Sequence, residues 1–104
     1  MHDSLPMIDT DDLIRWRASL AEDVVYREFP SETIMLNLAT GKYHGLNQVG
    51  GRMLALLERV PSVGAAVAPL AAEFDQPAGV IERDLRDLCR ALRDRGLISV
   101  TPTE

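Results

Sequence analysis

Residues 36–47 read LNLATGKYHGLN, and this stretch decides the fold of the chain. An alternating run, Thr33 to Leu38, leads into it, and a second short run, Lys42 to Leu46, follows the turn residues Ala39-Thr40-Gly41. Glycine adopts positive φ without steric cost, which Gly41 needs in a hairpin loop of three or four residues. The two runs are therefore predicted to pair as antiparallel strands.

A further strand is predicted on the N-terminal side of this hairpin. Residues 23–29 are rich in β-branched and aromatic side chains, and Pro30-Ser31-Glu32 closes the run with turn chemistry. The three runs then form an antiparallel meander whose last strand, Lys42 to Leu46, is short and contains Gly45. A glycine inside a strand often marks the close approach of another backbone. This last strand is therefore predicted to lie at the edge of the sheet.

Beyond Asn47 the hydrophobic period changes from 2 to 3.6, which predicts helices. Asn47 is suited to cap a first helix over 48–59. The adjacent glycines Gly50-Gly51 disfavour that helix by about 1 kcal/mol each relative to alanine, which indicates that something packs closely there. A second helix is predicted over 63–74, and Pro69 should kink or shorten it.

The third predicted helix covers 78–95 and ends at Gly96, a residue typical of helix C-termini. Its apolar residues recur at spacings of 4, 3 and 4, and they are Ile81, Leu85, Leu88 and Leu92. Basic residues near its end, Arg93 and Arg95, suit the helix dipole. The whole pattern predicts an α+β domain with winged-helix character, in which a three-stranded antiparallel sheet is followed by three helices.

The chain is 104 residues long and is predicted to form one domain. Residues 1–12 are interpreted as a flexible acidic arm, 13–100 as the domain and 101–104 as a tail. The sequence leaves open whether a small apolar patch forms an added edge strand or a short helix; the patch is Leu13, Ile14 and Trp16. It also leaves open whether Leu97, Ile98 and Val100 pack back or add a strand.

Composition excludes several classes of protein. Hydrophobic residues make up 46% and charged residues 26%, which are ordinary globular values. No apolar run approaches the roughly 20 residues of a membrane span, and residues 1–6 do not resemble a signal peptide. The single cysteine, Cys89, forms no internal disulfide, so a cytoplasmic location is expected and no membrane contact is predicted.

The charge distribution argues against nucleic-acid binding. Residues 1–32 hold eight acids and three bases, whereas 33–104 hold eight of each. Five arginines of the third predicted helix suggest a helix-turn-helix, but four carboxylates interleave with them, and such mixing is usually a solvated face. The alternative function is a DNA-binding winged helix or another protein-interaction domain. No nucleic-acid partner is predicted, because a nearly neutral body would neutralise few phosphates.

The sequence shows no sign of an enzyme. No metal-binding, phosphate-binding or nucleophile motif is present, and neither His2 nor His44 pairs with a carboxylate or cysteine at motif spacing. Cys89 lies beside the apolar stripe of the third helix and is interpreted as a small buried residue. We therefore expect no catalytic residue, no cofactor and no metal.

Residues 37–50, NLATGKYHGLNQVG, resemble the signature of PqqD-like proteins. These are also called RiPP recognition elements, after the ribosomally synthesised and post-translationally modified peptides they serve, and they include the stand-alone leader-binding proteins of lasso-peptide pathways. The resemblance covers roughly 23–98 and extends to Glu73-Phe74-Asp75, Glu82-x-Asp84-Leu85 and Gly96-Leu97. It implies a protein that binds the N-terminal leader of a precursor peptide and presents it to a modifying enzyme or leader peptidase.

An exposed edge strand can bind a peptide by adding it to the sheet as a further strand. The leader is expected to lie against Lys42–Leu46, in a groove beside the third helix. The helix flank formed by Asp84, Asp87 and Ala91 is predicted to border that groove, although both carboxylates could instead pair with arginines or face solvent. The candidate peptide-binding residues are Lys42, Tyr43, His44, Gly45, Leu46, Asp84, Leu85, Asp87, Leu88 and Ala91.

Overall fold

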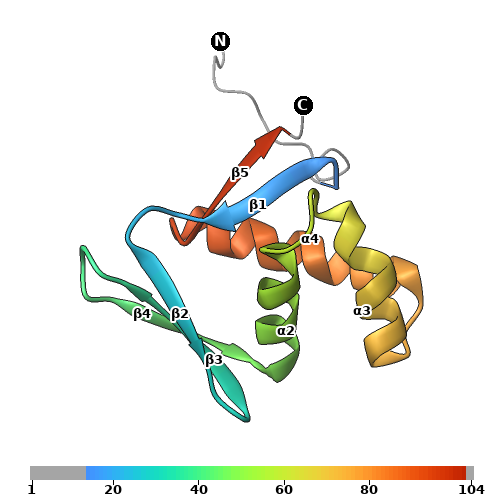
Figure 1. Ribbon diagram of the computed structural model, residues 1–104, viewed down its shortest axis with the longest axis horizontal. Coiled ribbons are helices and arrows are strands. Elements are labelled where there is room, and N and C mark those ends of the chain that lie inside the picture. The colour runs from blue at the N-terminus through green and yellow to red at the C-terminus, as the bar shows by residue number, and fades with distance from the viewer. Residues whose placement is uncertain (1–13, 103–104) are drawn as a thin grey trace.

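The computed structural model describes residues 14–102 and has the predicted α+β architecture (Figure 1). The strands are β1 (Trp16–Leu20), β2 (Val24–Glu28), β3 (Glu32–Asn37), β4 (Tyr43–Asn47) and β5 (Ile98–Pro102). The helices are α2 (Gln48–Leu57), the short 3₁₀ helix η1 (Gly64–Ala66), α3 (Val67–Phe74) and α4 (Ala78–Asp94). The predicted arm, 1–12, lies outside the described residues.

Strands β2, β3 and β4 form the predicted antiparallel meander, in that order. The β3–β4 turn contains Gly41 at φ 76°, the positive value expected from its position. Asn37 holds this turn, because its side-chain Oδ1 accepts hydrogen bonds from the backbone N–H groups of Ala39 (2.9 Å) and Thr40 (3.1 Å). The three strands lie within one residue of their predicted bounds. Local turn chemistry therefore sets the register of the hairpin.

A second sheet, which the sequence analysis did not predict as such, joins the two ends of the described chain. Strands β1 and β5 pair antiparallel, with Trp16 opposite Pro102 and Leu20 opposite Ile98. The apolar residue Trp16 therefore belongs to a strand rather than to a helix. Part of the predicted tail, Thr101 and Pro102, also belongs to the ladder. Figure 1 shows this pair above the helices and separate from the three-stranded sheet.

Helix α2 begins where the sequence predicts, because the Asn47 side chain accepts a hydrogen bond of 2.8 Å from the backbone N–H of Gly50. It packs against β3 and β4, and the close packing predicted at the paired glycines is confirmed. A Cβ atom built on Gly51 would lie 2.9 Å from the Cβ of the buried Thr33 on β3. The absence of a side chain at Gly51 therefore sets how closely the first helix approaches the sheet.

The hydrophobic core lies between the inner face of the meander and the three helices. Met35 of β3 has no exposed surface, nor have Leu85, Cys89 and Leu92 of α4. Pro69 does not kink a long helix; instead α3 begins at Val67, so that Pro69 falls in the first turn, where its missing N–H costs no hydrogen bond. The predicted second helix is thus shortened.

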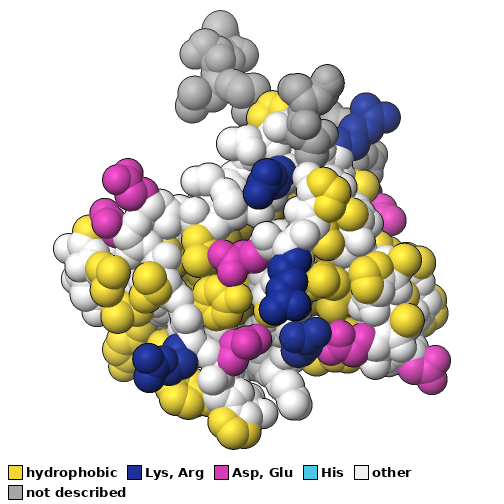
Figure 2. All heavy atoms as spheres, in the orientation of Figure 1, with side chains coloured by type: hydrophobic (Ala, Val, Ile, Leu, Met, Phe, Trp, Pro, Cys, Tyr) yellow, Lys and Arg dark blue, Asp and Glu magenta, His cyan; other side chains and the backbone are white. Residues whose placement is uncertain are grey.

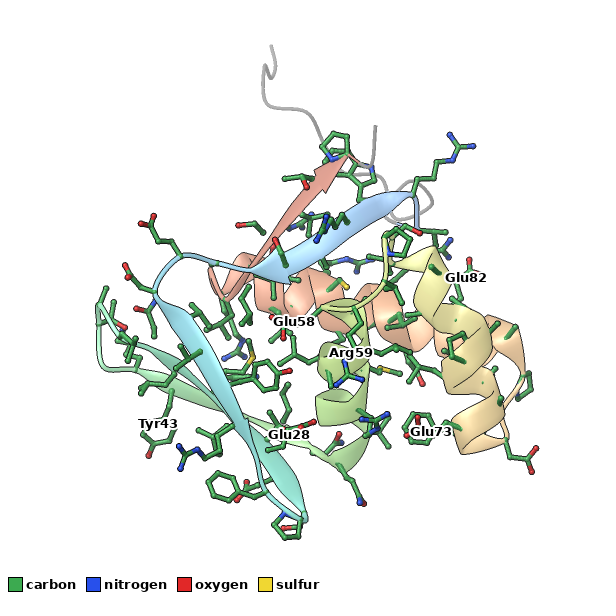
Figure 3. The ribbon with its side chains drawn as sticks, in the orientation of Figure 1. Glu28, Tyr43, Glu58, Arg59, Glu73 and Glu82 are labelled. Carbon is green, nitrogen blue, oxygen red and sulfur yellow. The ribbon has the colours of Figure 1, made fainter. Side chains whose placement is uncertain are left out.

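Glu73, labelled in Figure 3, links α3 to α2. Its two carboxylate oxygens accept hydrogen bonds from Nε (2.8 Å) and Nη2 (3.1 Å) of Arg52. This paired geometry, with both side chains about 40% exposed, holds the pKa of Glu73 below its usual value. The end of α3 is then closed by Asp75 in the left-handed conformation, at φ 53°. The Glu73-Phe74-Asp75 sequence therefore has a structural role.

Candidate functional site

Strand β4 is an edge strand, as predicted, because the sheet order ends with it. The N–H of Asn37 donates to the C=O of Lys42 at 2.9 Å, which fixes the alternation of the β3–β4 ladder. In an antiparallel pair every second residue turns its N–H and C=O toward the partner strand. His44 and Leu46 therefore bond to β3, whereas Tyr43 and Gly45 direct both backbone groups away from it, toward the open edge.

A cavity of about 400 Å³ opens beside this edge, between the β3–β4 hairpin and the end of α4. Its lining residues come from the hairpin and from the segment that follows α4, and they are Asn37, Thr40, Lys42, Tyr43, His44, Arg95 and Leu97. Leu97 is buried and forms an apolar wall, whereas Lys42 and Tyr43 are exposed. The cavity and the open edge together form a groove, called here the β4 groove.

Arg95, at the C-terminal end of α4, contacts the hairpin. Its Nη1 lies 3.3 Å from Nδ1 of His44. A guanidinium group has only donors, so Nδ1 accepts this hydrogen bond and the ring proton of neutral His44 is assigned to Nε2. Partial burial, and then the charge of Arg95, lower the pKa of His44 from its usual value of 6.5. His44 is therefore expected to be neutral at pH 7.

The lowered pKa of His44 predicts how protonation acts on the fold. The unfolded chain takes up a proton at about pH 6.5, before the folded chain does, so protonation opposes folding. This contribution to stability is complete above pH 6.5 and is lost as the pH falls through the folded-state pKa. An NMR titration of the imidazole should give a midpoint below 6.5, and Arg95→Gln should raise it. A wild-type midpoint at or above 6.5 would contradict the partial burial of His44, and an unchanged midpoint in Arg95→Gln would contradict the His44–Arg95 contact.

The predicted residues of the strand occupy three different positions. Lys42, Tyr43 and His44 line the cavity, and Gly45 continues the open edge. Leu46 is buried beneath β4 and turns its backbone toward β3, so it supports the strand from below. The side chain of Tyr43, 75% exposed, stands on the outer face of the sheet, away from the helices (Figure 3).

The predicted residues of α4 do not line this cavity. Leu85 has no exposed surface and Leu88 is partly buried, whereas Asp84, Asp87 and Ala91 are exposed. Ala91 lies one turn before Arg95, about 6 Å along the axis and on the same side of the helix. Because Arg95 reaches β4, the flank that contains Ala91 is the one that continues toward the groove.

Sequence reasoning missed four of the lining residues: Asn37, Thr40, Arg95 and Leu97. Asn37 and Thr40 belong to the quoted hairpin and could have been found from it, since both lie at the turn that leads into Lys42. Arg95 had no such signal, because a basic residue at the end of a helix is explained by the helix dipole alone. Its place in the cavity wall and its contact with His44 identify it as part of the site.

The single cysteine, Cys89, is buried in the core and is not among the residues that line the groove. Burial raises the pKa of the Cys89 thiol to about 12, so this cysteine is the inert core residue that was predicted. Within residues 14–102, no three His, Cys, Asp or Glu side chains are grouped to hold a metal ion. In the same range, none of the helices is long and apolar enough to cross a membrane.

The outer face of the meander is apolar and exposed. Hydrophobic side chains gather there, at the left of the view in Figure 2. They surround a shallow hollow of about 460 Å³ whose lining includes Val25, Phe29, Ile34 and Leu36. Phe29 is 48% exposed and Val25 45%. This hollow and the β4 cavity share no lining residue, but Leu36 and Ile34 pair with Tyr43 and Gly45 of β4, so the two surfaces meet at that strand.

This chain was compared with family models, with solved structures and with curated proteins. The family model for coenzyme PQQ synthesis protein D (PqqD) matches residues 32–98. A solved structure described as TbiB1 in complex with the TbiA(beta) leader peptide is 36% identical, with a TM-score of 0.68, and the match covers 77% of this chain and 93% of that one. No curated protein matches this chain.

A second solved structure supports the fold. It is described as lasso peptide synthetase B1 complexed with the leader peptide, and it matches with a TM-score of 0.70 at 19% identity. The match covers 80% of this chain and 98% of that one. The family model alone spans more than half of the chain, including the β3–β4 hairpin and all of α4. The chain therefore belongs to the PqqD family.

Proposed function

We propose that this protein is a non-catalytic peptide-binding module, a RiPP recognition element. It takes the leader of a ribosomally synthesised precursor as an additional strand on β4. It then presents the bound precursor to a modifying enzyme or leader peptidase, which carries out the catalysis. Holding the precursor in this way raises the effective concentration of its core segment at the partner's active site. A freshly translated precursor is met in the cytoplasm, where we expect the module to act.

One observation carries the proposal: the open edge of β4 lies beside a cavity. Tyr43 and Gly45 offer two N–H and two C=O groups to an added strand, and each hydrogen bond contributes about 1 kcal/mol net. Four such bonds give only weak binding after the peptide has been ordered. Side-chain contacts in the β4 groove must supply the remaining affinity and the specificity.

The comparisons support the proposal through one relative in particular. The structure that is 36% identical to this chain contains a bound leader peptide, and it aligns over most of both chains. The same peptide, the TbiA(beta) leader, therefore serves as a probe for this protein. A scrambled peptide of identical composition is the matched control.

The experiment is an NMR titration of the ¹⁵N-labelled protein with the TbiA(beta) leader. We expect the amides of Tyr43 and Gly45 to shift together with those of Arg95 and Leu97, and the Tyr43 and Gly45 amides to become protected from hydrogen exchange. The scrambled peptide should cause neither change. No response at millimolar peptide, or shifts confined to α2, would overturn the proposal.

Ala91→Trp tests whether the flank of α4 borders the groove. Tryptophan at this exposed position should fill the space beside β4 without touching the buried stripe. We expect leader affinity to fall at least tenfold, about 1.4 kcal/mol, with an unchanged circular-dichroism spectrum and melting temperature. Ala72→Trp, at an exposed position on α3, is the control and should bind normally. Normal binding by Ala91→Trp would place this flank in solvent, away from the peptide.

A further inference from the structure

The turn end of the β4 groove is basic, although the chain as a whole has a formal net charge of −5. Three of the residues that line the cavity, Lys42, His44 and Arg95, are basic types, and the lining includes no acidic residue. The remaining lining residues are uncharged. A ligand that enters this end of the groove therefore meets positive charge that nothing in the cavity wall neutralises.

Arg95 and Lys42 have no carboxylate partner within 4.0 Å among residues 14–102. Other arginines among the described residues do have one: Arg52 pairs with Glu73, Arg86 with Glu82 and Arg93 with Asp94. Arg95 instead contacts the neutral ring of His44, which uses one of its five N–H donors. Most of its donor capacity is thus free.

The polar side chains of the turn cannot supply the missing acceptors. Asn37 Oδ1 already accepts from the N–H groups of Ala39 and Thr40. Thr40 Oγ1 accepts from the N–H of Lys42 at 3.2 Å. Because these oxygens serve the turn backbone, the cavity presents an excess of donors to a ligand. Such a site suits an anionic, oxygen-rich group.

We propose that the turn end of the β4 groove is a specificity subsite for the carboxylate of an Asp or Glu side chain in the bound leader. The inference rests on the proposed function, since the acidic residue must arrive on a strand paired with β4. In such a strand, residues opposite Tyr43 and Gly45 point to the outer face. A residue opposite Lys42 or His44 points inward, where Arg95 and Lys42 receive its carboxylate.

The test is selection from a phage-displayed library of random ten-residue peptides. Each peptide is fused to the coat protein through its carboxyl end, so that only side-chain carboxylates are sampled. The library is selected against wild type, Arg95→Gln and Arg17→Gln. Arg17 is an exposed residue on β1, in the other sheet, and removes the same charge away from the groove. Circular dichroism verifies that all three proteins are folded.

We expect wild type and Arg17→Gln to enrich Asp or Glu at one position, and Arg95→Gln to lose that enrichment while the other preferences persist. A selected peptide whose acid is changed to Asn or Gln should bind wild type about three- to tenfold more weakly. On Arg95→Gln, the substituted peptide and the original peptide should bind with equal affinity. The loss should shrink at high salt, because both cations are exposed.

Two failures can be told apart. The first failure concerns peptides that bind wild type but not Gly45→Pro. If these peptides show no preference for an acidic residue, or show the same preference when selected on Arg95→Gln, the subsite is overturned and the proposed function stands. The second failure is that every recovered peptide binds Gly45→Pro and wild type with equal affinity. This result would mean that β4 is not the binding edge. In that case the proposed function itself fails, and the subsite with it.

Discussion

Replacing Gly45 by proline is expected to lower leader affinity at least a hundredfold, about 2.7 kcal/mol, while the protein stays folded. The N–H of Gly45 points toward the open edge, so the sheet itself does not use it. Proline removes this donor, which contributes about 1 kcal/mol to the added strand. Its ring also occupies the place of the amide hydrogen, where a strand must approach to within about 4.8 Å. Fluorescence anisotropy with the labelled TbiA(beta) leader measures the loss.

Gly45→Ala is the matched control for this result. A Cβ atom at this position would lie 3.7 Å from Cδ1 of Ile34, an ordinary contact, and Gly45 does not have a positive φ. Alanine keeps the N–H, so leader affinity should stay within about threefold of wild type, since the hydrogen bond is retained. Equal binding by the proline and alanine variants would show that the peptide does not pair with β4.

Gly51→Ala is expected to destabilise the fold by about 1–3 kcal/mol, as overpacking of a close contact does. The added methyl group would lie 2.9 Å from Cβ of Thr33, and the β3 backbone carries Thr33, so helix and sheet must separate. Intrinsic helix propensity alone would favour alanine by about 1 kcal/mol. The steric conflict outweighs the helix propensity, so the free energy of unfolding is expected to fall. Urea unfolding followed by circular dichroism gives the free energy of unfolding.

Gly79→Ala separates these two effects. Gly79 is also helical, in the first turn of α4, but a Cβ atom there would have no neighbour within 4 Å. The same substitution should leave stability unchanged or raise it by up to about 1 kcal/mol. If Gly51→Ala unfolded at the same urea concentration as wild type, the contact between α2 and β3 would be looser than the structure shows.

The elements that could be predicted from the sequence are those with local causes. Gly41 supplies the positive φ of the hairpin, Asn47 caps α2, and the spacing of apolar residues in α4 places its buried face. Each of these signals acts within a few residues. The PqqD-like resemblance rests on the same hairpin, which explains why the fold and the family could be recognised together.

Long-range pairings could not be predicted in this way. Strands β1 and β5 lie at opposite ends of the described chain. Both are half-exposed, so neither shows a clear alternation of apolar and polar residues from which the pairing could be predicted. The contact between His44 and Arg95 joins residues 51 positions apart. Which flank of α4 faces β4 depends on that contact. The sequence analysis selected Asp84, Asp87 and Ala91 along one line of α4, and it overlooked Arg95, which continues that line one turn later.

The register of the β1–β5 pair also determines how the domain responds to mechanical force. Trp16 faces Pro102 at one end of the ladder, and Leu20 faces Ile98 at the other. A pull applied before Trp16 and after Pro102 therefore loads one pair of residues at a time, each held by about 1 kcal/mol per hydrogen bond. Strands that are peeled apart in this order separate more easily than strands that slide past each other under load. Under tension β1 and β5 would unzip first, and the meander that carries the β4 groove would bear load only afterwards.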